Sequence, residues 1–69
     1  MPLHRKAEEA GIISPIELAL LARVFQATGR TGENETDREA RASRILGYYL
    51  AGIDDESELI TLARQPLQR

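Results

Sequence analysis

Residues 36–64 read TDREARASRILGYYLAGIDDESELITLAR, and this stretch decides the fold. Thr36 and Glu39 have the spacing of a capping box, which predicts that a helix begins there. Two sets of apolar residues then recur three or four positions apart, as on the buried faces of helices. They are Ala42, Ile45, Leu46, Tyr49 and Leu50, then Leu59, Ile60, Leu62 and Ala63. The stretch predicts two helices, over about 37–51 and 55–64, with their apolar faces turned the same way.

The corner between these helices has the residues of a helix stop followed by a helix start. Gly52 tolerates the positive φ that ends many helices, and Ile53 stands where a Schellman motif places its apolar contact. Asp54 or Asp55 then caps the next helix, which is expected to end before Pro66.

A third main helix precedes this hairpin, over about 15–28. Ser14 is a favoured N-cap residue, proline suits the first helical position, and Glu17 completes a capping box. Gly29 is expected to end the helix in the left-handed conformation. A polar connection over 30–35 leads to the next helix.

The ends of the chain carry weaker signals. Residues 2–10 predict a short leading helix that stops at Gly11, with residues 1–10 frayed because the apolar face is thin. Residues 66–69 are expected to form a tail. The fold class is therefore all-α, a compact helical bundle in a single domain over 1–69.

Composition limits the possible functions. A chain of 69 residues buries only about 60 % of its unfolded surface, so it is only marginally stable by itself. It has no cysteine, which excludes disulfides and thiolate metal sites. Its net charge of −2 gives no attraction to nucleic acid or anionic lipid. The longest apolar run is too short to span a membrane and no secretion signal is evident, so we expect a cytoplasmic protein.

The helix after Ser14 is apolar around most of its circumference. Ile16, Leu20 and Val24 form one line, and Leu18, Leu21 and Phe25 form another. The hairpin can cover only one of them, so the first line predicts a self-association face and a homodimer. The alternative is that the leading segment covers the same line through three apolar residues. They are Leu3, Ala7 and Ile12.

The expected core combines residues of all three main helices. It consists of Leu21, Phe25, Ile45, Leu46, Tyr49, Leu59 and Leu62.

Catalysis has little support in the sequence. The single histidine, His4, is in the terminal segment, where a nucleophile–histidine pair would have no rigid support. The carboxylates within 54–58 fall in the first turn of a helix, where negative charge is favoured electrostatically. We therefore expect no enzyme, and we identify no catalytic residue, metal ligand, cofactor or small-molecule ligand.

Two sequence features could indicate nucleic-acid binding. Residues 29–32 have the G-x-x-G form of KH-domain loops, and the Gly52 corner is similar to a helix-turn-helix turn. Acidic residues adjoin both features and would repel phosphate, so we keep this function only as the alternative. It would use an arginine-rich set of residues: Arg30, Arg38, Arg41 and Arg44.

One polar helix face is a candidate interaction patch. Arg41, Arg44 and Tyr48 fall within about 60° of one another on the side away from the apolar stripe. Exposed tyrosine beside arginine is typical of protein interfaces, whereas a merely solvated face would explain the same residues.

Residues 18–63 resemble small helical proteins of alphaproteobacteria. The resemblance consists of a Val-Phe pair at 24–25, an acidic loop, an aliphatic helix and the Gly-Ile-Asp corner at 52–54. It implies a stand-alone bacterial cytoplasmic domain and no particular activity. Taken together, the residues predict a non-enzymatic protein–protein interaction module that forms a homodimer or docks on a larger partner.

Overall fold

Four stretches of this sequence form helices in the computed structural model, which describes residues 2–12 and 14–65. The helices are α1 (Pro2–Glu9), α2 (Pro15–Ala27), α3 (Glu35–Leu50) and α4 (Glu56–Arg64). The described residues include no strand, so the all-α prediction is confirmed. The tail predicted over 66–69 lies outside the described residues.

The corner between α3 and α4 follows the local signals closely. Gly52 has a φ of 108°, and its N–H donates to Tyr49 O over 3.0 Å. The N–H of Ile53 donates to Tyr48 O over 3.1 Å, which completes the Schellman pattern. The side chain of Asp55 accepts the N–H of Glu58, so Asp55 is the cap of α4.

Three other helix ends differ from the prediction. The side chain of Ser14 makes no hydrogen bond at the start of α2, so the predicted capping box with Glu17 does not form. The cap of α3 is Asn34, whose side chain accepts the N–H of Asp37 over 2.8 Å, so the helix begins two residues before the predicted start. Gly29 does not adopt a positive φ, and α2 ends at its C-cap Thr28. The Thr28 hydroxyl replaces the glycine stop because it lies 2.8 Å from Val24 O.

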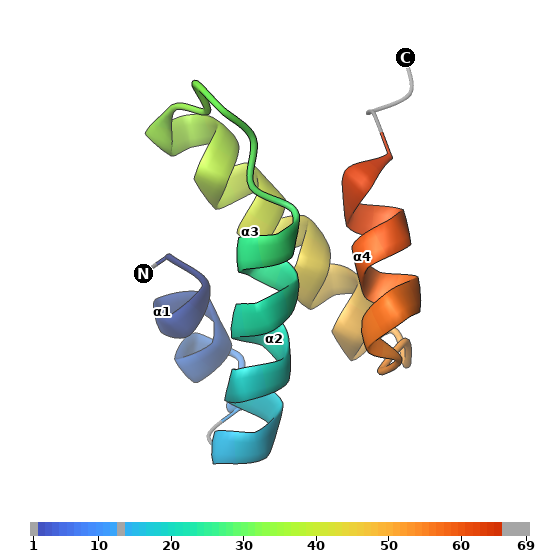
Figure 1. Ribbon diagram of the computed structural model, residues 1–69. Coiled ribbons are helices and arrows are strands. Elements are labelled where there is room, and N and C mark those ends of the chain that lie inside the picture. Colours follow the sequence, from blue (N-terminus) through green and yellow to red (C-terminus); the bar gives the residue numbers. More distant parts are fainter. Residues whose placement is uncertain (1, 13, 66–69) are drawn as a thin grey trace.

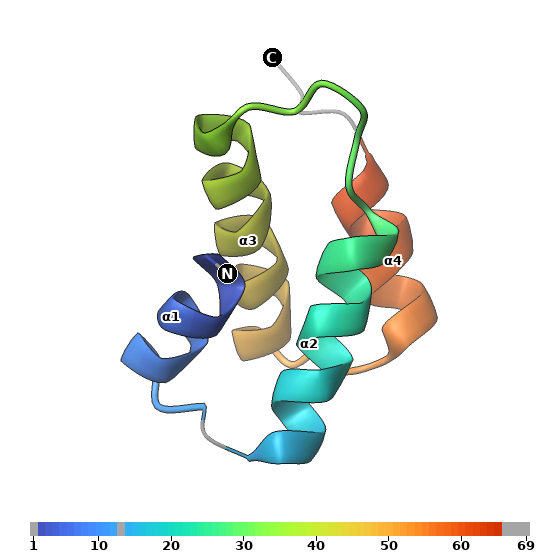
Figure 2. The ribbon, with the colours of Figure 1, turned by 60° about the vertical axis from the view of Figure 1, so that its left-hand side comes forward.

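The helices are arranged around a central pair. Helices α2 and α3 pack on each other, and each contacts both α1 and α4, which lie on opposite sides of the pair. Successive helices alternate in direction, as Figures 1 and 2 show. The described residues span 31 × 22 × 20 Å.

Most of the expected core is confirmed, and α1 adds to it. Leu21, Phe25, Ile45, Leu46 and Leu59 are buried, whereas Tyr49 and Leu62 are half-buried. Three residues of the leading segment are buried beside them, although the expected core contained none of that segment. They are Leu3, Ala7 and Ile12. The expected stripe on α3 is too long by one residue, because Leu50 at the end of the helix is 61 % exposed.

Candidate functional site

The patch predicted on α3 does not form an exposed surface. Arg41 is only 7 % exposed, so its placement on a solvated face is wrong. Arg44 and Tyr48 are half-buried, and Tyr48 packs against the hydrophobic core. The physical reason is that α3 contacts three other helices, so a much wider arc of it is covered than one apolar stripe suggests.

Arg41 lies between the end of α2 and the start of α3. Its Nε and Nη2 donate to the two Glu33 carboxylate oxygens over 2.9 and 2.8 Å. Its Nη1 donates to Phe25 O and, over 2.9 Å, to Thr28 Oγ1. The guanidinium also stacks over the Phe25 ring, with 4.0 Å from Cζ to the ring centroid. Arg41, on α3, thus binds the segment between the two helices through the bidentate ion pair with Glu33 and binds α2 through the cation–π contact with Phe25.

This ion pair changes the acidity of its carboxylate. The hydrogen bonds from Arg41 hold the pKa of Glu33 below its ordinary value, although burial opposes the shift. The charges of Arg41, Arg38 and Arg30 act in the same direction as the hydrogen bonds. Glu33 therefore stays ionised through the neutral range and keeps Arg41 paired.

Three further arginines donate to backbone carbonyls at the same end of the bundle. Arg64 Nη2 donates to Ala27 O over 3.0 Å, and Arg30 Nη2 donates to Arg64 O over 3.1 Å. Arg44 Nη2 lies 3.2 Å from Leu62 O and 3.0 Å from Gln65 O. Carbonyls at helix C-termini lack intrahelical partners, and cations there are favoured. These side chains therefore satisfy carbonyl groups at the C-terminal ends of α2 and α4.

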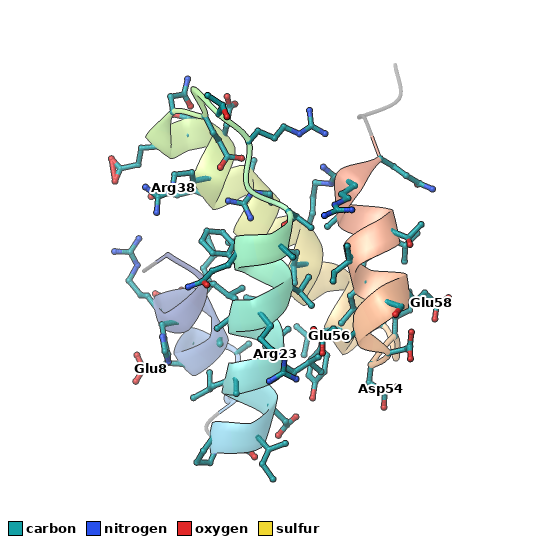
Figure 3. The ribbon with its side chains drawn as sticks, viewed as in Figure 1. Glu8, Arg23, Arg38, Asp54, Glu56 and Glu58 are labelled. Carbon is teal, nitrogen blue, oxygen red and sulfur yellow. The ribbon has the colours of Figure 1, made fainter. Side chains whose placement is uncertain are left out.

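A cleft of about 460 Å³ lies between the α2–α3 connection, the first half of α3 and the end of α4. Glu33 and Asp37 line it together with Arg30, Arg41 and Arg44. Arg30 and Arg44 use only Nη2 for their bonds to carbonyls, so other N–H donors of these two side chains remain, whereas the carboxylates of Glu33 and Asp37 in the lining repel an anion. Of the arginines proposed for nucleic acid, Arg38 is the exposed member that lies outside this cleft lining (Figure 3).

The predicted self-association line is divided by the fold. Val24 is fully buried, Leu20 is half-buried against the core, and Ile16 is 82 % exposed. A single face containing all three is therefore wrong, because Val24 points into the interior. The leading segment packs on α2 and α3 and buries its own apolar residues there, but it does not cover the whole line as the sequence alternative proposed, because Ile16 stays exposed.

An apolar surface remains on the first two turns of α2. We call it the α2 face, and it consists of Pro15, Ile16, Ala19 and Leu20. Beside it, a shallow groove of about 350 Å³ separates α1 from α2. The groove is lined by His4, Pro15, Leu18, Ala19 and Ala22. Leu50 is exposed at the same end of the bundle, where α3 finishes.

A hydrogen bond joins the helices at this end. The Tyr49 hydroxyl donates to Glu17 Oε1, which ties the last turn of α3 to the first turn of α2. This bond, burial and the nearby charges of Glu17 and Asp54 raise the pKa of Tyr49 to about 12. Tyr49 is therefore protonated at neutral pH, and its hydrogen bond fixes the first turn of α2, which carries part of the α2 face. The sequence pattern gave no signal for this pair, because the two residues are 32 positions apart.

The described residues contain no cluster of three histidine, cysteine or carboxylate side chains that could hold a metal ion. His4 is exposed beside the apolar groove, away from the carboxylates of α4. Within the described part of the chain, no helix is both long enough and apolar enough to cross a membrane.

Comparison of the chain with protein-family models, with curated proteins and with solved structures finds no match.

Proposed function

We propose that this chain is a non-enzymatic protein–protein interaction module that docks a partner on the α2 face. The observation that carries the proposal is Ile16, which stands 82 % exposed on a helix that is otherwise packed against three others. Pro15 and Ala19 extend the apolar surface, and the groove beside them gives this surface a concave part. Contiguous apolar surface bordered by polar residues is typical of protein interaction sites.

The free-energy cost of exposing Ile16 also supports a docking role for the α2 face. Leaving an aliphatic side chain in water forfeits about 1.5–3 kcal/mol relative to full burial. A domain of this size has little stability to spare, and a single core often supplies no more than about 3–5 kcal/mol. An Ile16 that gains burial in a complex would recover much of that loss.

The face is also rigid enough for recognition. The first turn of α2 is fixed by the Tyr49–Glu17 hydrogen bond, and proline at its first position restricts the backbone. A preformed helix face loses little conformational entropy on binding, so more of the contact energy appears as affinity.

The test is capture from a lysate of the source cell with tagged chain as bait. The parent chain is compared with Ile16→Ser and with Gln26→Ser, a matched change at another exposed position of α2. We expect a protein that the parent and Gln26→Ser retain in equal amount and that Ile16→Ser loses. Titration of that purified protein should then show the same order of affinities. Equal retention by all three baits would overturn the proposal.

A further inference from the structure

The charges near the α2 face are distributed unevenly. The segments 14–23 and 49–60 meet at the end of the bundle where α2 begins and α3 finishes, and we call this the acidic end. It carries five carboxylates, from Glu17, Asp54, Asp55, Glu56 and Glu58. Arg23 is its one basic residue, so its net charge is −4 against −2 for the whole chain.

Several of these carboxylates already have partners within the chain. Arg23 Nε and Nη2 each lie 3.1 Å from Glu56 Oε1, and Glu17 accepts the Tyr49 hydroxyl. Asp55 caps α4. Asp54 and Glu58 are exposed at the lower end of α4 (Figure 3). Of the five carboxylates of these two segments, Asp54 and Glu58 are therefore the ones placed to meet a charge on another molecule.

The apolar surface borders this charge. At 100° per residue, Ile16, Leu20 and Arg23 fall within about 60° on α2. Arg23 reaches the first residue of α4, so the flank of α2 that carries Ile16 is the flank turned toward α4. Asp54 is close enough to Tyr49 to raise its pKa, and Tyr49 in turn contacts Glu17, next to Ile16. Exposed aliphatic and exposed carboxylate groups thus share one end of the molecule.

We infer that the occupant of this surface is a basic amphipathic segment of a partner protein. An apolar side chain of that segment would pack on Ile16, and its lysine or arginine side chains would face Asp54 and Glu58. The inference rests on the proposed function and specifies the chemistry of the partner. Charge complementarity of this kind accelerates encounter and excludes partners of the same sign.

The same charge argues against a second copy of this chain. A two-fold pairing of the α2 face would bring the two acidic ends close together, with −4 on each. Like charges that face each other across an interface cost several kcal/mol. Nucleic acid and anionic lipid carry the same sign as this end and are disfavoured in the same way.

The probe is a labelled helical peptide with leucine on one face and lysine on its flanks, titrated with the protein by fluorescence anisotropy. A second peptide has glutamate in place of every lysine. We expect the lysine peptide to bind at least about tenfold more tightly, and this advantage to shrink as salt is raised. Equal affinity of the two peptides, or an affinity that salt does not change, would overturn the inference.

Paired variants locate the charges responsible. Asp54→Asn with Glu58→Gln removes two exposed carboxylates of the acidic end, whereas Glu35→Gln with Asp37→Asn removes two exposed carboxylates at the start of α3, the opposite end of the bundle. Circular dichroism confirms the helix content of each pair. We expect the first pair to weaken binding of the lysine peptide by about threefold to tenfold and the second to leave it unchanged. Equal weakening by both pairs would overturn the inference, because the effect would then come from net charge alone.

Ile16→Ser and the mass of the protein alone separate this inference from the proposed function. We expect a monomer by sedimentation velocity, and loss of peptide binding in Ile16→Ser. A dimer that Ile16→Ser abolishes would overturn the basic partner and keep the interaction role, with a second copy as occupant. Unchanged peptide binding in Ile16→Ser would overturn the inference, and equal lysate capture by that variant would overturn the proposed function as well.

Discussion

Arg41 is a charged residue that the fold treats as part of its interior. Its guanidinium supplies a bidentate bond to Glu33, a bond to Thr28 and a stacking contact with Phe25, all from one planar group. An isolated buried charge would be strongly unfavourable, whereas one with every donor directed at a partner is tolerated. The residue therefore contributes through geometry that only arginine offers at this position.

Arg41→Lys tests that geometry. Lysine can keep the charge but not the two parallel bonds to Glu33 together with the bonds to Phe25 and Thr28. Removing one partner of a buried pair costs about 3–5 kcal/mol, and we expect Arg41→Lys to lose a large part of that amount. Urea unfolding measures the loss. Arg38→Lys, an exposed change on the same helix, should stay within about 0.5 kcal/mol, and similar midpoints for the two variants would contradict the role of Arg41.

Acid should weaken the fold through Glu33. Because its pKa is lower in the folded state than in the unfolded chain, the ion pair adds stability above the unfolded pKa of about 4.3. That contribution is lost as the pH falls from this value through the lower pKa of the folded state. We expect Glu33→Gln to be less stable than the parent at neutral pH and to lose less on acidification. Urea midpoints recorded from neutral pH into the acid range measure this, and parallel curves would contradict it.

At the scale of elements, the corner between α3 and α4 was predictable because its signals are local. A glycine, an aliphatic residue and an aspartate within four positions specify the stop, the contact and the next cap. Gly52, Ile53 and Asp55 take these roles in the structure.

A pair of glycine variants tests the corner. Gly52→Ala places a side chain at positive φ and should cost about 1–2 kcal/mol. Gly47→Ala, within α3, should instead stabilise by about 0.5–1 kcal/mol because it lowers the entropy of the unfolded chain. A Cβ at either position meets nothing within 4 Å, so packing does not confound the comparison. Thermal melts report both, and a shift of the same sign in the two variants would contradict the turn geometry.

The end of α2 and the start of α3 could not be predicted from local sequence rules. Asn34 and Thr36 are both good cap residues, and the sequence offers no decisive choice between them. Acidic residues follow both candidates, at 35 and 37 after Asn34 and at 37 and 39 after Thr36, so the charge of the first turn does not separate them either. The stop of α2 involves Arg41, which lies 13 positions after Thr28. Contacts of that range depend on tertiary packing and are not contained in any local pattern.

For the whole molecule, the least expected feature is the leading helix. The thin apolar face of this segment predicted fraying. In the structure, α1 buries two residues in the surface that α2 and α3 form together. The same packing divides the predicted self-association line, since Val24 belongs to the interior and Ile16 does not. Which side of an all-round apolar helix stays open depends on the placement of its neighbours, and periodicity alone does not specify that.

Leu3→Ala tests whether α1 belongs to one cooperative unit. Leu3 is fully buried, so its truncation should cost about 2–5 kcal/mol, as in other cores. Leu50→Ala, the same change at an exposed leucine, should stay within about 0.5 kcal/mol. Urea unfolding followed by helix content and by tyrosine fluorescence should give coincident transitions. A neutral Leu3→Ala, or two separate transitions, would show that α1 folds apart from the rest.

The packing of α1 on α2 and α3 also limits the order in which the chain can fold during its synthesis. Helix α1 packs chiefly on α3, the third helix to be made. At translation rates of roughly 5–20 residues per second, α1 is finished several seconds before α3 is complete. Its buried residues remain without their final surroundings for that interval, and so does the inner side of α2. The nascent chain therefore carries uncovered apolar surface until its second half emerges, which makes this the stage at which a chaperone or a wrong contact would reach it.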